Sequence, residues 1–321
     1  MIDSLFAVTE SHSYDSHNNL GGTMLRHLLI LIAFLSSATF ANADSASVSK
    51  KWLCGPDAWG EASPFSLFIR HDVDHQNTDC EGRVAVGGNA IFKHYSLGRR
   101  VSFNIEQKYT LVVGGSLWFE DGSFFGGPIW CGGGSHLKNY SHHFATHCGK
   151  RNHHLQPPVH FSQSFSRMES LSLYWSSLAA NGKVLRMGDE LIFKTETVDS
   201  SSRWYHLVVD HAELSEAQSI RFEIPPNSHV LVTVTGHGRA VLSNMGMKLG
   251  GLSAAQIVWH FPQATLLSIR NTRLSGVVFA PSTDVDFVDG LIEGKLIGKS
   301  LIGNGQINQA QFSACVPAPI R

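Results

Sequence analysis

Val84-Ala85-Val86-Gly87-Gly88 is a short apolar run closed by two glycines, and the chain repeats this pattern twice. It returns as Leu111-Val112-Val113-Gly114-Gly115 and as Ile129-Trp130-Cys131-Gly132-Gly133, at steps of 27 and 18 residues. A second pair of runs, residues 276–280 and 294–298, is also offset by 18 residues. Such units predict stacking, because each short strand can bury its apolar side only against its neighbours. We therefore expect a mainly β fold, a right-handed β-solenoid (a discontinuous β-helix).

The charge balance narrows the range of partners. The chain has 321 residues, a formal net charge of −1 and 16% charged residues. It therefore lacks the basic surplus that is typical of proteins bound to nucleic acid or to anionic membranes. We expect no nucleic-acid partner.

The N-terminal region has the features of an export signal. Residues 24–27 form a short basic region, residues 28–40 are apolar, and Ala41-Asn42-Ala43 is a small-x-small cleavage site. We expect residues 1–43 to be an upstream leader plus a signal peptide, which is removed to leave Asp44 as the mature N-terminus. No second apolar run of spanning length follows, so we expect no transmembrane anchor in the mature chain. The expected location is secreted or cell surface.

Five cysteines fit an exported protein, since disulfides form in oxidising compartments. They are Cys54, Cys80, Cys131, Cys148 and Cys315. The nearest pair, Cys131 and Cys148, brackets a histidine-rich segment, and we predict a disulfide between them. The remaining connectivity is open, although Cys315 is placed to tie down a terminus. A four-cysteine zinc site is the alternative, but the chain has no Cys-x-x-Cys pair.

The other segments predict one insertion and one helix. Residues 134–156 are rich in Gly, Ser, Asn, His and Pro, which predicts a histidine-rich loop insertion. Residues from about 160 to 181 predict a helix that ends at Asn181-Gly182. Residues 72–79 are polar and predict a loop. We expect the helix to pack along the side of the solenoid through Phe161, Phe165, Met168, Trp175 and Leu178.

The histidine-rich segment holds the strongest candidates for metal ligands, which are His142, His143, His147, His153 and His154. Neutral imidazoles at close spacing are the commonest ligands of zinc, copper and nickel. However, the segment has no His-x-x-x-His pair on a predicted helix and no flanking carboxylate to orient the rings. We therefore interpret it as a solvated loop with adventitious metal affinity, and we expect no cofactor.

Residues 81–90 and 258–265 form two ordered motifs, and these motifs resemble those of the choice-of-anchor A family of exported bacterial surface proteins. The first is Glu81-Gly82-Arg83-Val84-Ala85-Val86-Gly87-Gly88-Asn89-Ala90. The second is Val258-Trp259-His260-Phe261-Pro262-Gln263-Ala264-Thr265, continued by residues 274–281 and 290–301. The chain has His260 and Gln263 where the family pattern has Asn and Glu. The resemblance covers roughly residues 65 to 310 and implies one adhesive or ligand-binding domain, 44–321, without known catalytic residues.

These observations favour a non-enzymatic adhesion or ligand-binding module of the cell surface or extracellular matrix. The expected partner is an extracellular ligand, such as a glycan or a matrix protein, and its binding residues are unknown. A carbohydrate-active β-helix enzyme is one alternative, and a structural matrix component is another. Ice binding is a further alternative, because ice-binding proteins share the solenoid-plus-helix architecture. Those proteins expose flat rows of Thr, Ser or Ala, whereas strand alternation here places Arg83, Lys295 and Lys299 outward.

Overall fold

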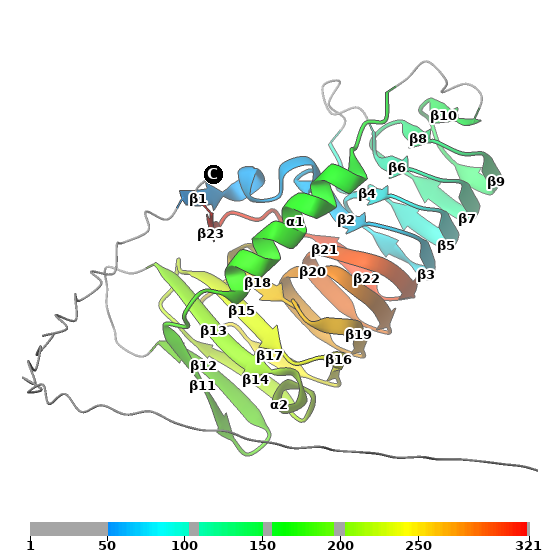
Figure 1. Cartoon of the computed structure of the whole chain (residues 1–321). Helices are drawn as coiled ribbons and strands as arrows, with labels where there is room; N and C mark the ends of the chain where they lie inside the picture. Colours follow the sequence, from blue (N-terminus) through cyan, green and yellow to red (C-terminus); the bar gives the residue numbers. More distant parts are fainter. Residues whose placement is uncertain (1–50, 103–108, 150–155, 196–202, 320–321) are drawn as a thin grey trace, which may run out of the picture. The chain divides into compact units, whose positions relative to one another are not determined.

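The computed structural model describes residues 51–102, 109–149, 156–195 and 203–319 (Figure 1). The expected signal peptide, its cleavage site at Asp44, and His153 and His154 lie outside these residues. Within the described ranges, no helix is both long and apolar enough to cross a membrane.

Parallel strands stack in coils around an apolar interior and form three faces (Figure 1). The helix face, named for the helix that covers it, is formed by β13 (Trp204–Asp210), β15 (His229–Thr235), β18 (Ile257–His260), residues 277–280 of β20 (Arg273–Val288), residues 295–298 of β21 (Leu291–Gly303), β2 (Phe65–Ile69), β4 (Arg83–Val86), β6 (Leu111–Val113), β8 (Ile129–Cys131) and β10 (Thr146–Cys148).

The other two faces are built from the remaining parts of the same coils. The open face is formed by β16 (Gly238–Ser243), β19 (Ala264–Arg270), the last parts of β20 and β21, and the first halves of β3 (Val73–Cys80), β5 (Ala90–Leu97), β7 (Leu117–Phe124) and β9 (Ser135–Ser141). The third face is formed by the first parts of β20 and β21, by β22 (Gln306–Gln309), and by the second halves of β3, β5, β7 and β9.

The order of the coils in space differs from their order in sequence. The first coil, which begins with β2, stacks directly on the last coil, because β2 pairs with β21 and β3 pairs with both β21 and β22. Figure 1 shows the blue and cyan strands lying beside the orange and red ones. The two ends of the described chain also meet, since β1 (Lys51–Cys54) pairs with β23 (Cys315–Ala318) and a disulfide joins Cys54 to Cys315.

The repeats read from the sequence pair with one another in the structure, which confirms the stacked β architecture. Val84 pairs with Leu111, and Leu111 pairs with Ile129. The glycine pairs form stacked corners that leave no space for a side chain: a Cβ at Gly114 would lie 2.2 Å from the carbonyl oxygen of Gly87. The handedness of the solenoid stays a prediction.

Helix α1 (Phe161–Ser176) lies along the helix face (Figure 1) and buries its apolar side there. The Phe165 ring stacks on Phe68 at 5.3 Å between centroids, and Trp175 packs against Phe279 at 4.8 Å. The Trp175 indole also donates a hydrogen bond to the carbonyl oxygen of Pro317 at 2.8 Å. Helix α1 ends at Ser176, earlier than expected, and Gly182 begins a strand instead of capping the helix.

A smaller sheet and a second helix complete the described structure. The sheet is formed by β11 (Gly182–Met187), β12 (Glu190–Thr195), β14 (Ser219–Glu223) and β17 (Gly246–Lys248), and the second helix is the short α2 (His211–Ser215). Among the described residues, short 3-10 turns span Gly55–Ala58, Gly60–Ala62 and Ala254–Gln256.

Two polar segments that were expected to be loops contain strands in their described parts. Residues 72–79 lie mostly in β3, because Val73, His75 and Cys80 point into the core while the polar residues between them point outward. Residues 134–156 contain β9 and β10, so this stretch adds a coil to the solenoid. Strand pairing with β7 and β8 outweighs the turn-like composition of these residues.

Candidate functional site

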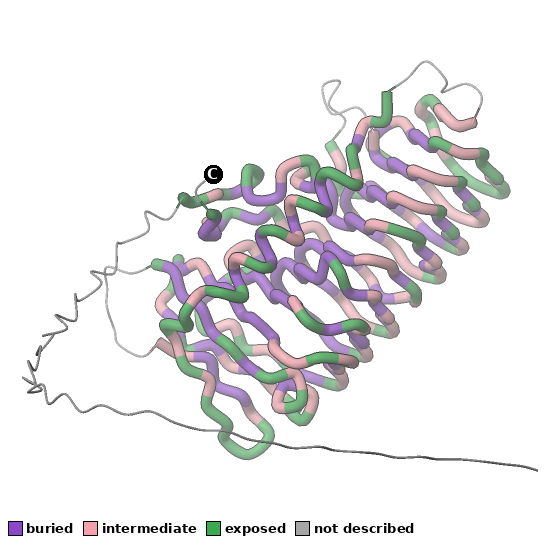
Figure 2. The backbone as a smooth tube through the Cα atoms, in the orientation of Figure 1, coloured by how far each residue is buried: buried purple, intermediate pink, exposed green. Residues whose placement is uncertain are grey.

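The three faces differ in what covers them. Figure 2 shows buried and exposed residues alternating along the coils, with helix α1 lying over one side. Most outward apolar residues in the middle of the helix face are buried beneath α1 and the chain ends, among them Phe68, Val258 and Phe279. The open face keeps large outward side chains exposed to solvent. We therefore searched the open face and the third face for a recognition surface.

The helix face contains a buried series of polar contacts that has a structural role and does not form a binding site. Thr233 Oγ1 lies 2.9 Å from His206 Nε2 and 3.2 Å from His260 Nδ1. The other ring nitrogen of His260 lies 2.7 Å from Ser172 Oγ on α1. Burial lowers the pKa of His260 to about 3, so this imidazole is neutral at pH 7. The chain of contacts ties the helix to the solenoid and leaves His260 inaccessible.

One row of outward side chains crosses the open face in register, and we call it the open-face row. It consists of Ile302, Asp74, Ile91, Trp118 and His136. Adjacent strands in a sheet lie about 4.8 Å apart, so these side chains follow one another at that spacing. The exposed fractions of Ile91, Trp118 and Ile302 are 36%, 43% and 55%, which are high for such large apolar side chains.

Aromatic stacking and an ion pair flank this row. The rings of Trp118 and His136 stack with centroids 3.9 Å apart and an interplanar angle of 23°. Two residues further along the same strands, Lys138 forms an ion pair with Glu120. The hydrogen bond from Lys138 lowers the pKa of the Glu120 carboxyl below its usual value. The row therefore combines apolar contact area with fixed charge on a flat sheet.

At the other end of the open face, on β16, β19 and the last parts of β20 and β21, the outward side chains are engaged in polar contacts. Arg239 donates a hydrogen bond to the hydroxyl of Ser268 at 3.2 Å, and Ser268 is fully buried. Arg270 pairs with Asp286, and Lys299 pairs with Asp284 at 2.8 Å. The apolar surface is therefore concentrated around the open-face row.

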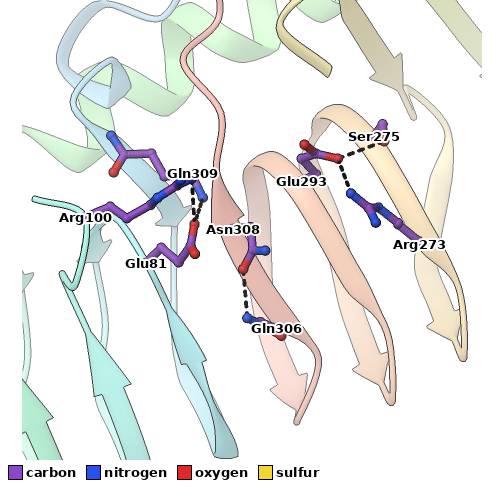
Figure 3. A network of polar contacts seen from close by, with 8 residues as sticks. All are labelled: Glu81, Arg100, Arg273, Ser275, Glu293, Gln306, Asn308 and Gln309. Carbon is purple, nitrogen blue, oxygen red and sulfur yellow. Dashed lines mark hydrogen bonds and ion pairs between the residues drawn. The ribbon is translucent and has the colours of Figure 1, made fainter. Parts of the chain in front are cut away.

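The third face is polar and carries small side chains. Asp79, Ser96, Ser123 and Ser141 pair in register across β3, β5, β7 and β9. Figure 3 shows the neighbouring coils of this face, where Glu293 accepts hydrogen bonds from Arg273 at 2.8 Å and Ser275 at 3.4 Å. We call the three aligned serines Ser96, Ser123 and Ser141 the serine row.

A residue with left-handed backbone conformation forms the corner between the open face and the third face in successive coils. The turn that follows the open-face strands has φ between 46° and 57° at Asn77, His94, Asp121, Asn139, Asn244, Asn271 and Asp289. Asn and Asp tolerate this conformation better than other non-glycine residues. Side-chain hydrogen bonds join successive turns, as from Asn271 to Asn244 at 2.7 Å. The corner fixes the register of the row, because each turn stacks on the next.

The three predicted histidine candidates that the structure describes, His142, His143 and His147, do not converge. His142 lies 3.1 Å from the carbonyl oxygen of Gly127, and burial lowers its pKa. His143 is exposed, and the His147 ring contacts Tyr109 edge-on at 6.1 Å. In the ranges that the structure describes, no three His, Cys, Asp or Glu side chains group closely enough to hold a metal ion.

A disulfide joins Cys131 to Cys148, which pair in register on the neighbouring strands β8 and β10. Cys80 is a free, buried thiol that points into the core, and burial raises its pKa to about 12. A thiol in this state is unreactive.

Two residues expected at the surface are buried. Arg83 and Lys295 do point away from the solenoid interior, but their exposed fraction is only 5% each. The Lys295 ammonium donates hydrogen bonds to the carbonyl oxygens of Ala62 at 2.8 Å, Ser63 at 3.1 Å, and Phe65. The segment before β2 covers these outward positions, which strand alternation alone does not reveal.

The open-face row was not predicted from the sequence, although a signal for part of it exists. Ile91, Trp118 and His136 each stand three residues after the second glycine of a repeat, in the strand that follows the corner. Reading the repeat beyond its glycines would have aligned these positions. Ile302 and Asp74 carry no such signal, because their coils lack the glycine pair.

Comparison with known proteins places the chain in a family. The family profile described as "Putative Ice-binding-like adhesive domain" matches residues 58–309, so the chain belongs to this family of adhesive domains. No curated protein matches the chain. The match supports the broader expectation of an adhesive or ice-binding-like protein, while the narrower resemblance to choice-of-anchor A stays a prediction.

Solved structures of ice-binding proteins show distant similarity. The protein of the Antarctic ascomycete Antarctomyces psychrotrophicus is 14% identical, with a TM-score of 0.37, covering 81% of this chain and 100% of that one. A protein from an Antarctic biological consortium is 10% identical, with a TM-score of 0.37 and coverages of 78% and 88%. Ice-binding protein 1 of Shewanella frigidimarina is 11% identical, with a TM-score of 0.33 and coverages of 79% and 96%. The family assignment rests on the profile match.

Proposed function

We propose that this protein is an exported, non-enzymatic adhesion module that binds an extracellular ligand through its open face. The observation that carries the proposal is the open-face row, where Ile91, Trp118 and Ile302 are exposed in register on a flat sheet. Exposed apolar patches rimmed by polar groups mark interaction surfaces on proteins. The adhesive description of the family supports this function.

The ligand that fits this row is an extended polymer, such as a surface glycan or a matrix protein. Side chains repeated at strand spacing favour a partner that is itself linear and repetitive. The stacked pair Trp118 and His136 supplies an aromatic edge, and the Lys138–Glu120 pair supplies hydrogen-bonding groups. Two disulfides are consistent with an oxidising extracellular location. The narrower resemblance to the choice-of-anchor A family is part of this proposal.

The test is binding of the mature chain to immobilised matrix polysaccharides and matrix proteins, followed by substitutions in the row. We expect Trp118→Ala and Ile91→Ser each to weaken binding at least tenfold. The matched control is Leu173→Ser, which removes an exposed apolar side chain from the outer side of α1. Unchanged binding in both row variants, or an equal loss with Leu173→Ser, would contradict the proposal. Release of soluble product from the bound polysaccharide would instead support the enzyme alternative.

Ice binding is a second candidate, and the serine row favours it. Ser96, Ser123 and Ser141 are small hydroxyl side chains aligned on a flat face. The measurement is thermal hysteresis, with Ser123→Tyr to disrupt the row and Trp118→Ala as the control on the open face. Hysteresis that disappears with Ser123→Tyr and survives Trp118→Ala would assign ice binding to the third face. We expect no hysteresis, because the row is short and the carboxylate-bearing Asp79 borders it beside Ser96.

A further inference from the structure

The open-face row is a strip of defined length that crosses the adjacent strands β21, β3, β5, β7 and β9. Figure 1 shows β3, β5, β7 and β9 lying side by side. At the usual strand spacing, the strip is about 19 Å long. Beyond Ile302 the register continues to Asp286, which is held in an ion pair with Arg270. At the other end, β9 pairs with β7 alone among the described strands.

Polar side chains border the strip on both of its long sides. The first border, two residues before the row on successive strands, is formed by Asp72, Asn89 and Ser116. The second border, two residues after the row, is formed by Gln76, Lys93, Glu120 and Lys138. An apolar strip between two polar borders fits a flat polymer that has apolar faces and hydrogen-bonding edges.

Contacts within the protein hold the centre of the strip in place. The Trp118 ring stacks on His136, and its indole N–H donates a hydrogen bond to the carboxylate of Glu120. The same carboxylate pairs with Lys138 on the next strand. A ligand that packs against Trp118 therefore meets a side chain that is already ordered, which lowers the entropic cost of binding.

The charges along the strip and its borders are of mixed sign. Two lysines, Lys93 and Lys138, stand among three carboxylates, Asp72, Asp74 and Glu120. This arrangement places hydrogen-bond donors and acceptors next to one another and does not create a field of one sign. It favours a neutral partner with hydroxyl groups, which both donate and accept, over a strongly charged polymer.

The spacing of the row separates a glycan from a polypeptide. Neighbouring side chains of the row are about 4.8 Å apart. An extended polypeptide presents side chains on one side at intervals of about 6.6 Å, because its residues rise by about 3.3 Å and alternate in direction. A β-1,4-linked glycan instead advances by nearly the strand spacing for each sugar residue. Its extended ribbon also has apolar ring faces between two hydroxyl-bearing edges, so it matches both the repeat and the borders.

Resting on the function proposed for the open face, we propose that the row binds a neutral β-1,4-linked glycan, which runs across the strands with one sugar residue over each strand. Ile302, Ile91 and Trp118 pack against the ring faces, as apolar and aromatic side chains do in ligand sites. The two borders form hydrogen bonds with the hydroxyls on either edge of the glycan. The strip has room for about five sugar residues at the strand spacing.

The test is calorimetric titration of the purified protein with β-1,4-linked glucose oligosaccharides, from the disaccharide to the hexasaccharide. We expect the affinity to rise with chain length up to the pentasaccharide and then to level off, because a longer chain extends beyond the row. The matched probes are α-1,4-linked glucose oligosaccharides of the same lengths. They should bind at least tenfold more weakly, because the α-linkage coils the chain and prevents it from following a straight row.

Two substitutions test the direction in which the glycan runs. Trp118 and Ile302 lie three strands apart, about 14 Å, which is beyond the reach of a disaccharide bound at the larger Trp118 surface. Trp118→Ala should weaken binding of the disaccharide and the pentasaccharide at least tenfold. Ile302→Ser should reduce the gain in affinity from disaccharide to pentasaccharide at least fivefold. The matched control is Val208→Ser, since Val208 is exposed on β13 of the helix face, outside the row.

Two results would overturn the proposal and leave open-face adhesion standing. The first is no binding of any β-1,4-linked oligosaccharide at millimolar concentration, while a matrix protein still binds in a Trp118-dependent manner. The second is an unchanged gain in affinity in Ile302→Ser, which would mean that the glycan follows the strands instead of crossing them. Unchanged binding of every ligand by Trp118→Ala would overturn both this proposal and the function of the open face.

Discussion

Acid should destabilise this protein through two buried histidines. His75 and His260 are fully buried, and burial lowers the pKa of each to about 3. In the unfolded chain an imidazole has a pKa of about 6.5. The unfolded state therefore binds more protons between these two values, so the free energy of unfolding falls as the pH falls through this window.

The size of the effect follows from the two pKa values. At pH 5 the unfolded imidazole is almost fully protonated, whereas the folded one is almost entirely neutral. Between pH above 7 and pH 5, the free energy of unfolding therefore falls by about 2 kcal/mol for each histidine, and by about 4 kcal/mol for both. This is a large fraction of the stability of an ordinary domain.

The assay is urea unfolding of wild type, His260→Asn and His237→Asn at pH 7 and pH 5. Asparagine can keep a hydrogen bond to Ser172 or Thr233 but does not titrate. We expect His260→Asn to lose about 2 kcal/mol less than wild type between the two pH values. His237 is exposed, so His237→Asn should respond to acid as wild type does. An equal loss in His260→Asn and wild type would refute the reasoning.

Two further pairs of substitutions, each a test variant with its control, probe the packing. Trp175→Ala should cost about 3–5 kcal/mol in the free energy of unfolding, because it removes a buried ring between α1 and the helix face; Leu173→Ala, on the exposed side, should stay within about 0.5 kcal/mol. Gly114→Ala should cost about 1–3 kcal/mol, because the new Cβ would lie 2.2 Å from the Gly87 carbonyl oxygen. A Cβ at Gly134 would have no atom within 4 Å, so Gly134→Ala should leave the free energy of unfolding almost unchanged. Urea unfolding measures all four variants. Equal losses of stability within either pair would contradict the packing described.

The repeat could be predicted from the sequence because each of its units consists of neighbouring residues. The apolar run and the glycine pair at Val84 recur, and the structure places the three copies in register. The stripe of apolar residues around Trp175 likewise identified the helix that covers the solenoid. These features depend on residues close in sequence, where periodicity reports directly on burial.

The features of the fold that could not be predicted depend on contacts between segments that are distant in the sequence. The stacking of the first coil on the last requires knowledge of which strand edges meet, which no local period encodes. Lys295 is buried because residues more than 200 positions earlier cover it. The strand from Val73 to Cys80 was expected as a loop because its outward residues are polar.

The measurement that tests the central claim most directly is hydroxyl-radical footprinting of the protein bound to its extracellular ligand. Trp118 and Ile91 on the open face and Leu173 on α1 are all exposed in the free protein, so each reports on one surface. We expect the bound protein to show protection of Trp118 and Ile91, with labelling of Leu173 unchanged. Protection of Leu173 with full labelling of Trp118 would contradict the assignment of the open face as the adhesive surface.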